Sequence, residues 1–104
     1  MTELATCLIG RWMHSHEEDT DTTEIYRPEE YAFPPARGRT GYEFMPDGQA
    51  IYIGIAAADG STETHGRWEL DADDRVSVTA EDPRIERRVL HVQDCSPDKL
   101  VLSR

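Results

Sequence analysis

The feature that most constrains the fold is the regular return of turn residues between short segments of alternating apolar and polar residues. From Gly10 onward, turn residues recur about every eight to twelve positions. Three of these sites carry tight-turn chemistry: 45–48 (Met-Pro-Asp-Gly), 58–61 (Ala-Asp-Gly-Ser) and 95–98 (Cys-Ser-Pro-Asp). Short strands at this spacing are typical of a β-sandwich or a β-barrel. The sequence therefore predicts one all-β domain over residues 1–104.

The alternation predicts an antiparallel meander of about eight strands, most simply closed into a barrel. We expect the strands at 11–17, 22–27, 39–45, 49–56, 62–70, 75–80, 85–93 and 99–103. A short helical turn over residues 2–8 precedes them, with Thr2 as its N-cap. Four segments each place three residues on one face: Thr40, Tyr42 and Phe44; Ile51, Ile53 and Ile55; Gly66, Trp68 and Leu70; Val76, Val78 and Ala80.

Segment 85–93 does not show one apolar face. Ile85, Arg87, Val89 and His91 alternate with Glu86, Arg88, Leu90 and Val92, and the second face becomes more apolar near its end. A β-bulge, which inserts one extra residue into a strand, changes the face that later residues present. We therefore expect a bulge within this strand.

The charge balance restricts the partners. The chain has 11 Lys and Arg residues against 21 Asp and Glu residues, a formal net charge of −10. Such a charge repels phosphate backbones and anionic lipids, so we expect no nucleic-acid and no membrane partner. No apolar stretch reaches the length of a bilayer span, and Glu3 stands where a secretory signal would carry positive charge. These observations predict a soluble, cytoplasmic protein.

A tripeptide repeat carries a resemblance to a known family. Gly10-Arg11-Trp12 opens the first strand, and Gly66-Arg67-Trp68 repeats the pattern in the fifth. A Gly-x-Trp on the first strand of an eight-strand meander resembles the lipocalin and calycin barrels, and the chain is similar to small bacterial lipocalin-like domains of uncharacterised function. Glycine would let the base of the barrel close, and tryptophan would fill the closed end. The resemblance also implies a last-strand arginine stacked on Trp12, for which Arg104 is the candidate.

Strand directions in a simple meander predict which residues share an end of the barrel. If odd and even strands run in opposite directions, Cys7 and Cys95 lie at opposite ends, too far apart for a disulfide. A reducing compartment also disfavours the bond, so we expect two free thiols. The same count gathers His14, His16 and His91 at the open end.

The histidines are the densest chemical feature of the chain. His14 and His16 share the face of Trp12, and acidic residues follow at positions 17–19. Neutral imidazole binds zinc, copper or iron, so His14 and His16 are candidate metal ligands. Polar residues in a wet barrel mouth are the alternative interpretation.

The segment 28–38 is too long and too rich in proline for a hairpin turn. It holds three prolines together with Tyr31 and Phe33, which favours a packed loop. As a lid it would bring Tyr31, Phe33, Arg37 or Arg39 to a ligand. The direction count favours a plug over the closed end.

Motifs of known catalytic chemistry are missing. The sequence has no Gly-x-Ser-x-Gly, no phosphate-binding glycine-rich loop, no Cys-x-x-Cys and no His-Glu-x-x-His. We assign no catalytic residue, the sequence indicates no particular cofactor, and whether the protein is an enzyme stays open.

Three hypotheses follow. The first is a binding module for a modest apolar ligand. We expect Trp12 and Trp68 to belong to the core rather than to provide the surface on which the ligand lies. Its candidate ligand-binding residues are Trp12, His14, His16, Tyr42, Phe44, Ile53, Ile55, Trp68 and His91, with Val78 also in the lining. Bulky inward residues could instead fill an eight-strand barrel.

The second hypothesis is a metal protein or enzyme using His14, His16 and His91. The third is an assembly domain in which an uncovered strand edge pairs with a second copy as a homodimer.

Overall fold

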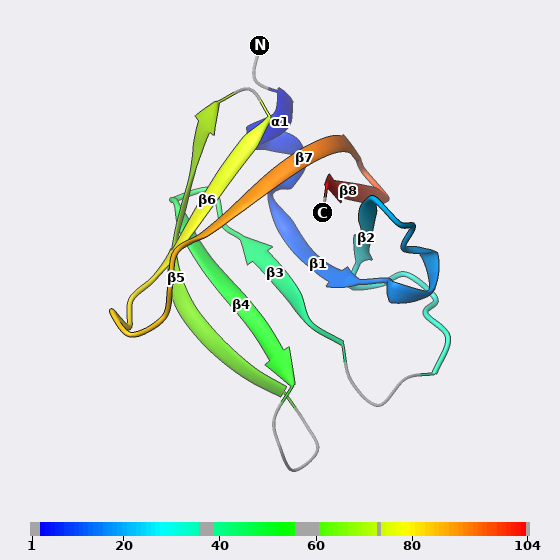
Figure 1. The fold of residues 1–104 in the computed structure, drawn as a ribbon, viewed down its shortest axis with the longest axis horizontal. Coiled ribbons are helices and arrows are strands. Elements are labelled where there is room, and N and C mark those ends of the chain that lie inside the picture. The colour runs from blue at the N-terminus through cyan, green and yellow to red at the C-terminus, as the bar shows by residue number, and fades with distance from the viewer. Residues whose placement is uncertain (1–2, 36–38, 56–60, 73, 104) are drawn as a thin grey trace.

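The computed structural model of the protein describes residues 3–35, 39–55, 61–72 and 74–103. They form a closed barrel of eight antiparallel strands preceded by one short helix (Figure 1). The elements are α1 (Glu3–Leu8), β1 (Gly10–His14), the 3₁₀ turn η1 (His16–Glu18), β2 (Thr23–Pro28), β3 (Gly41–Phe44), β4 (Gln49–Ile55), β5 (Ser61–Ala72), β6 (Arg75–Ala80), β7 (Arg88–Ser96) and β8 (Lys99–Ser103). The predicted fold class is confirmed, and the closed barrel fits a calycin-like fold. Thr2, the expected N-cap, lies outside the described residues.

The order of the strands differs at one point from a simple succession. β1 pairs with β2 on one side and with β3 on the other, and the remaining neighbours follow in the order β4, β5, β6, β7 and β8 before β8 closes on β2. Since β2 and β3 are both antiparallel to β1, they run in the same direction. The expected alternation of strand directions is therefore wrong at the connection between β2 and β3.

That connection runs along the outside of the barrel instead of turning at one end. β2 finishes with Pro28 opposite Trp12, whereas β3 starts with Gly41 opposite Met13, and the Thr40 carbonyl accepts a hydrogen bond from the His14 N–H (2.8 Å). The chain must therefore return from the end where β1 begins to the end where β1 finishes. Neither the expected plug nor a lid over the opening is seen in its described parts, and Arg37 lies outside them.

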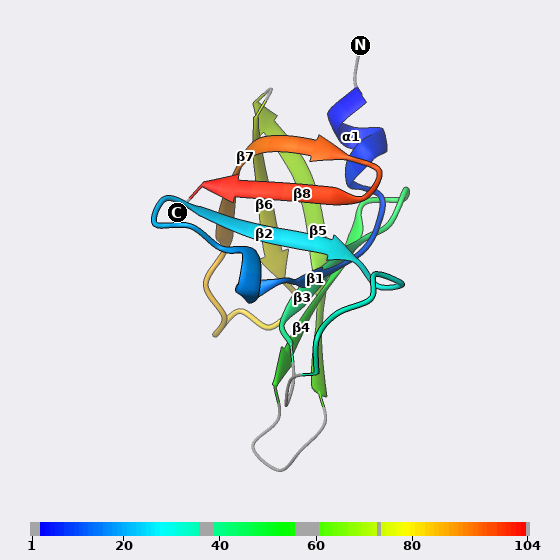
Figure 2. The same cartoon turned by 90° about the vertical axis from the view of Figure 1, so that its right-hand side faces the viewer.

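The two cysteines form a disulfide, so the prediction of free thiols is wrong. Cys7, next to the end of α1, is bonded to Cys95 near the end of β7, with a Cα–Cα distance of 6.3 Å. The reversed direction at β3 explains the error, because it makes β7 finish at the end where β1 begins. Figure 2 shows α1 beside the turn that joins β7 and β8. Disulfides persist mainly in oxidising compartments, so the expectation of a cytoplasmic protein loses the support of two free thiols.

A bulge in β7 turns Cys95 toward α1. Leu90 and Val92 pack against the core, and the pairing with β8 shifts register between Val92 and Asp94. The extra residue changes the face of the strand, so Cys95, three positions after Val92, also packs against the core. We expected a bulge partway along segment 85–93, and the observed one lies at the end of that segment.

The disulfide closes a long loop, because its cysteines are separated by 88 in the sequence. Cross-linking so long a segment restricts the unfolded chain, and we expect the double variant Cys7→Ser, Cys95→Ser to lose about 4 kcal/mol of unfolding free energy. Guanidinium unfolding of the oxidised protein with and without dithiothreitol measures the loss. The double variant is the control, since the reductant should not change its stability. Two titratable thiols in the folded, unreduced protein would contradict the bond.

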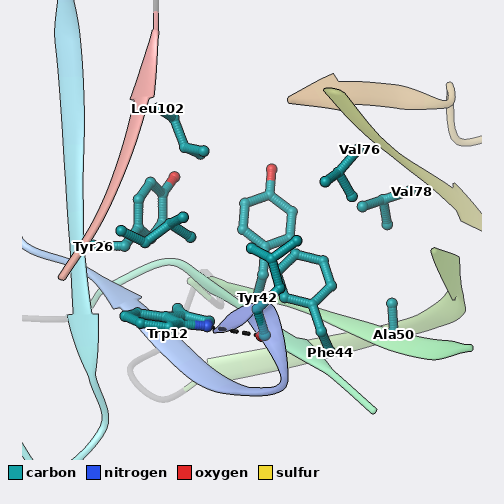
Figure 3. Close-up of a cluster of buried hydrophobic side chains, with 10 residues drawn as sticks. Trp12, Tyr26, Tyr42, Phe44, Ala50, Val76, Val78 and Leu102 are labelled. Atoms are coloured by element: carbon teal, nitrogen blue, oxygen red, sulfur yellow. Dashed lines mark hydrogen bonds between the residues drawn. The ribbon is translucent and has the colours of Figure 1, made fainter. Parts of the chain in front are cut away.

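The interior of the barrel is filled by a core that lies between α1 and the opposite mouth (Figure 3). Trp12 is 3% exposed, and its indole N–H donates a hydrogen bond to the Leu8 carbonyl (2.9 Å), which fixes α1 under the barrel. The prediction of Trp12 as core is confirmed. The buried members of the cluster are Leu8, Trp12, Tyr26, Tyr42, Phe44, Ala50, Val76, Val78, Leu100 and Leu102.

β4 shows the opposite face to the one we predicted. Ala50 pairs with the core residue Phe44, so Ala50 and Tyr52 point inward while Ile51 and Ile53 occupy the outer face. Ile53 is 1% exposed there, opposite Gly41, and the side chain of Ile55 lies outside the described residues. The expectation that Ile53 and Ile55 line the bore is therefore wrong for Ile53. The interior needs a small residue opposite the Phe44 ring, and Ala50 provides it.

The two Gly-x-Trp glycines serve different purposes. A Cβ at Gly66 would collide with the backbone of Thr79 and Ala80, so this glycine permits a close approach of β5 to β6, but at the mouth end of β6 and not at the base, where we expected it. Gly10 has open space around it but adopts φ = +134°, a conformation that side-chain-bearing residues avoid. Arg104, the expected partner of Trp12, lies outside the described residues.

Two side-chain stacks of the same composition hold the outer connection. Each consists of one glutamate, one arginine and one aromatic ring. Arg27 forms a two-bonded pair with Glu18 (2.8 and 2.7 Å), and its guanidinium lies 4.8 Å from the centre of the Tyr31 ring. Arg39 pairs in the same way with Glu17 (2.9 and 2.7 Å) and lies 4.5 Å from the Phe33 ring. The Tyr31 and Phe33 rings meet edge to face at 5.0 Å. The acidic residues of η1 thus anchor the connection.

The Glu18 stack can be followed by titration. Hydrogen bonds from Arg27, aided by one from Ser15 and opposed by burial, lower the pKa of Glu18 to about 2 from the ordinary value of 4.5. Because this pKa is lower in the folded state, the pair stabilises the fold above about pH 4.5 and loses that effect as the pH falls toward 2. We expect Arg27→Gln to raise the Glu18 pKa toward 4.5 in an NMR titration of the carboxyl carbons.

Arg84→Gln is the matched control, because the exposed Arg84 bonds Asp82 at 2.8 Å, away from η1. It should leave the Glu18 titration unchanged. A Glu18 pKa near 4.5 in the unaltered protein would contradict the stack.

Candidate functional site

A cavity of about 490 Å³ opens at the mouth of the barrel, the end opposite α1. Six strands contribute to it, most of them near their ends at the mouth, with Tyr52 coming from the middle of β4. Its walls are formed by His14, Glu24, Tyr26, Thr40, Tyr42, Tyr52, Arg88, Val89, Leu90, Leu102 and Ser103. The cavity is thus the upper end of the barrel interior, above the filled core.

A chain of aromatic contacts connects the core with this cavity. The Trp68 ring meets Phe44 edge to face (5.4 Å), Phe44 stacks with Tyr42 (5.9 Å), and Tyr42 contacts both Tyr26 (5.9 Å) and Tyr52 (5.4 Å). Figure 3 shows the hydroxyl oxygens of Tyr26 and Tyr42 on the side of the cluster away from Trp12. The floor of the cavity is therefore a rigid group of aromatic rings that carry hydroxyl groups.

The phenols of the floor stay protonated at neutral pH. Burial raises the pKa of Tyr26 far above its ordinary value of 10. Burial also raises the pKa of Tyr42, although the nearby Arg88 guanidinium acts in the opposite direction. Both side chains thus offer neutral hydroxyl groups that can donate or accept a hydrogen bond.

Arg88 forms the cationic part of the wall. It is the first residue of β7 and pairs with Val78, whose side chain belongs to the core, so Arg88 faces inward. Its guanidinium lies 4.6 Å from the centre of the Tyr52 ring, a cation–π contact. The wall therefore combines a positive charge with the flat face of a ring.

His14 is the predicted histidine that reaches the cavity. Its Nε2 is 2.8 Å from Asp19 Oδ2, and its ring stacks on Tyr26 at 4.9 Å. Asp19 also accepts the Ile25 backbone N–H (2.9 Å), so the carboxylate fixes the imidazole against β2. His14 is thereby oriented before any ligand arrives.

The other two histidines are not in the wall. β1 ends at His14, so His16 lies in η1 and is exposed, with its ring 6.1 Å from that of His14. His91 is exposed on the outer face of β7, opposite Arg75 at the other end of the barrel. Sequence reasoning grouped the three because it extended the first strand to residue 17 and reversed the direction of the seventh.

The remaining predicted residues divide in two. Tyr42 lines the cavity, whereas Trp12, Phe44 and Trp68 belong to the packing beneath it. The lining residues that sequence reasoning missed include Glu24, Tyr26, Tyr52 and Arg88. The sequence did indicate that Arg88 faces inward, because it shares the more apolar face of its segment with Leu90 and Val92.

Further hollows lie in the described parts of the chain, including one of about 360 Å³ beside Leu4, Asp74 and Val92. An apolar chamber of about 110 Å³ lies beside the mouth cavity, and Tyr52 and Arg88 line both. A hollow of about 570 Å³ lies beside the disulfide, between α1, Pro28–Glu30 and the turn after β7. Its charged lining residues Arg11 and Glu29 already form an ion pair (3.3 Å), so the mouth, whose Arg88 has no ion pair in the described part of the chain, offers the better set of binding groups.

Metal ligation has no support in the described residues. Among residues 3–35, 39–55, 61–72 and 74–103, no group of three or more His, Cys, Asp or Glu side chains is arranged to hold a metal ion. No helix in these segments is long and apolar enough to cross a bilayer. All eight described strands are paired on both sides, so the edge needed for pairing with a second copy is not found among them.

Comparisons with known proteins add one match. No family model and no curated protein matches the chain. A solved structure, described as the crystal structure of an uncharacterized protein from Bacteroides eggerthii DSM 20697, is similar with a TM-score of 0.53 and 12% identity. The match covers 93% of this chain and 98% of that one. It shows the fold alone.

Proposed function

We propose that the protein is a lipocalin-like binding module that takes a small organic molecule in the cavity at the barrel mouth. The observation that carries this proposal is the convergence of Tyr26, Tyr42, Tyr52, His14 and Arg88 on one cavity of about 490 Å³. Small-molecule sites have volumes of roughly 300–1,000 Å³ and combine apolar walls with a few oriented polar groups. The mouth has both properties.

The filled interior favours a ligand site at the mouth over one deep in the bore. Phe44, Val76 and Leu100 are at most 1% exposed, and they occupy the space that a bore-binding ligand would need. An apolar part of a ligand can instead lie on the Tyr52 ring and reach the chamber next to it. Val78, Ala80 and Ile85 give this chamber an apolar wall.

A side chain that fills the cavity should abolish binding. Thr40 lines the mouth just before β3, and we expect Thr40→Trp to place an indole in the cavity. The measurement is a screen of small aromatic and aliphatic fragments by ¹H–¹⁵N NMR. Ligands should shift the resonances of cavity residues in the unaltered protein, with at least a roughly tenfold loss of affinity in Thr40→Trp.

Thr79→Trp is the matched control. Thr79 is exposed on the outer face of β6, so it carries the same substitution without entering the cavity, and it should leave binding unchanged. Fragments that bind Thr40→Trp as well as the unaltered protein would overturn the proposed site. A screen without any fragment that shifts cavity resonances would count against the function itself.

A further inference from the structure

The mouth contains an arginine that has no carboxylate partner among the described residues. Five other arginines, namely Arg11, Arg27, Arg39, Arg84 and Arg87, form ion pairs with Asp or Glu. Arg88 forms none within the described part of the chain, although the protein has 21 acidic residues and only 11 basic ones. Arg67 and Arg75 also lack an ion pair there, but they lie on the outer face, whereas Arg88, although exposed to solvent, belongs to the lining of the mouth cavity. Arg88 is thus the unpaired guanidinium that faces a cavity.

The residue next to it shows how local this difference is. Arg87 points to the outside and donates a hydrogen bond to Asp71 Oδ2 at 2.9 Å. Arg88 points inward, where it meets the Tyr52 ring and the hydroxyl end of Tyr42. An inward cation left without an anion is a site at which a carboxylate can form charge-assisted hydrogen bonds.

The opposite wall carries a carboxylate with no cationic partner. Glu24 lies on the inward face of β2, two positions before Tyr26, whose hydroxyl donates to Glu24 Oε1 at 3.4 Å. No Lys, Arg or His of the described segments forms an ion pair with it. Arg88 and Glu24 act on the Tyr42 phenol with opposite sign, so both charges lie near this one ring.

The two charges face one cavity without neutralising each other. They form no ion pair in the structure, and a ligand with a single charge would satisfy one of them while being repelled by the other. A ligand with both charges would satisfy both walls at once. We propose that the mouth binds a small amphoteric molecule of the amino-acid type, with its carboxylate at Arg88 and its ammonium group at Glu24. This inference rests on the proposed function.

The shape of the mouth suits an apolar substituent on such a molecule. The chamber of about 110 Å³ adjoins Arg88 and Tyr52, so a side chain can enter it while the charged groups stay in the larger cavity. The Tyr52 ring provides a flat surface for an aromatic substituent. An aromatic amino acid is therefore the appropriate probe.

The test compares four probes that share a phenyl group but differ in charge: L-phenylalanine, 3-phenylpropanoate, 2-phenylethylamine and the neutral 3-phenylpropanamide. Affinities are measured at pH 7 by NMR titration and calorimetry. We expect phenylalanine to bind at least about tenfold more tightly than each of the other probes. Its binding should shift the resonances of Tyr42 and Tyr52.

Two charge-removing variants separate the contributions of the walls. Arg88→Gln should lower the affinity for phenylalanine to about that of the amine, and Glu24→Gln should lower it to about that of the acid. Arg87→Gln is the matched control, because it removes the neighbouring arginine on the outer face, and it should not change the affinity.

The outcomes distinguish this inference from the function on which it rests. If the acid alone or the neutral amide binds in the cavity as tightly as phenylalanine, the amphoteric ligand is wrong while a binding function stands. Unchanged phenylalanine affinity in Glu24→Gln leads to the same conclusion. If none of the four probes shifts the cavity resonances, the inference is overturned, and the fragment screen with Thr40→Trp then decides on the binding function.

Discussion

The pairing of β1 with both β2 and β3 determines the arrangement of the rest of the structure. It makes β2 and β3 run in the same direction, so the chain between them must return along the outside of the barrel. The stacks of Glu18 on Arg27 and Glu17 on Arg39 hold that return against η1. The same pairing reverses all later strands, which brings the end of β7 to α1. One shift in strand order thus creates both the outer connection and the geometry of the disulfide.

The disulfide also depends on the local irregularity in β7. Without an extra residue, strict alternation from Leu90 and Val92 would turn position 95 outward, away from Cys7. The bulge therefore links packing at the mouth to covalent closure at the base. A change of the apolar face within 85–93 predicted a bulge in this segment, but the observed one lies at its end, and the bond that it permits was not predicted.

Local patterns in the sequence were sufficient to predict the strands and turns, but not which strands lie next to each other in the barrel. The turn at Pro46 and Asp47 and the turn at Pro97 and Asp98 lie where their chemistry predicts, while the turn at 58–60 lies outside the described residues. Strand order is a non-local property. Nothing in the sequence of segment 28–38 indicates at which end of the barrel the next strand begins. The prediction of the inward face of β4 failed for a related reason. Packing against Phe44 determines which residues face inward, and their hydrophobicity does not.

The same dependence explains why the candidate site was predicted only in part. His14 and Tyr42 lie on strands whose face was read correctly, whereas Arg88 and Glu24 needed the closure of β8 on β2 to come to one cavity. A barrel this small fills its bore with side chains and leaves space only where the strands end. Charged residues can be placed there because their heads reach water while neighbouring rings contact their stems. Polar recognition at the mouth therefore follows from the filling of the interior.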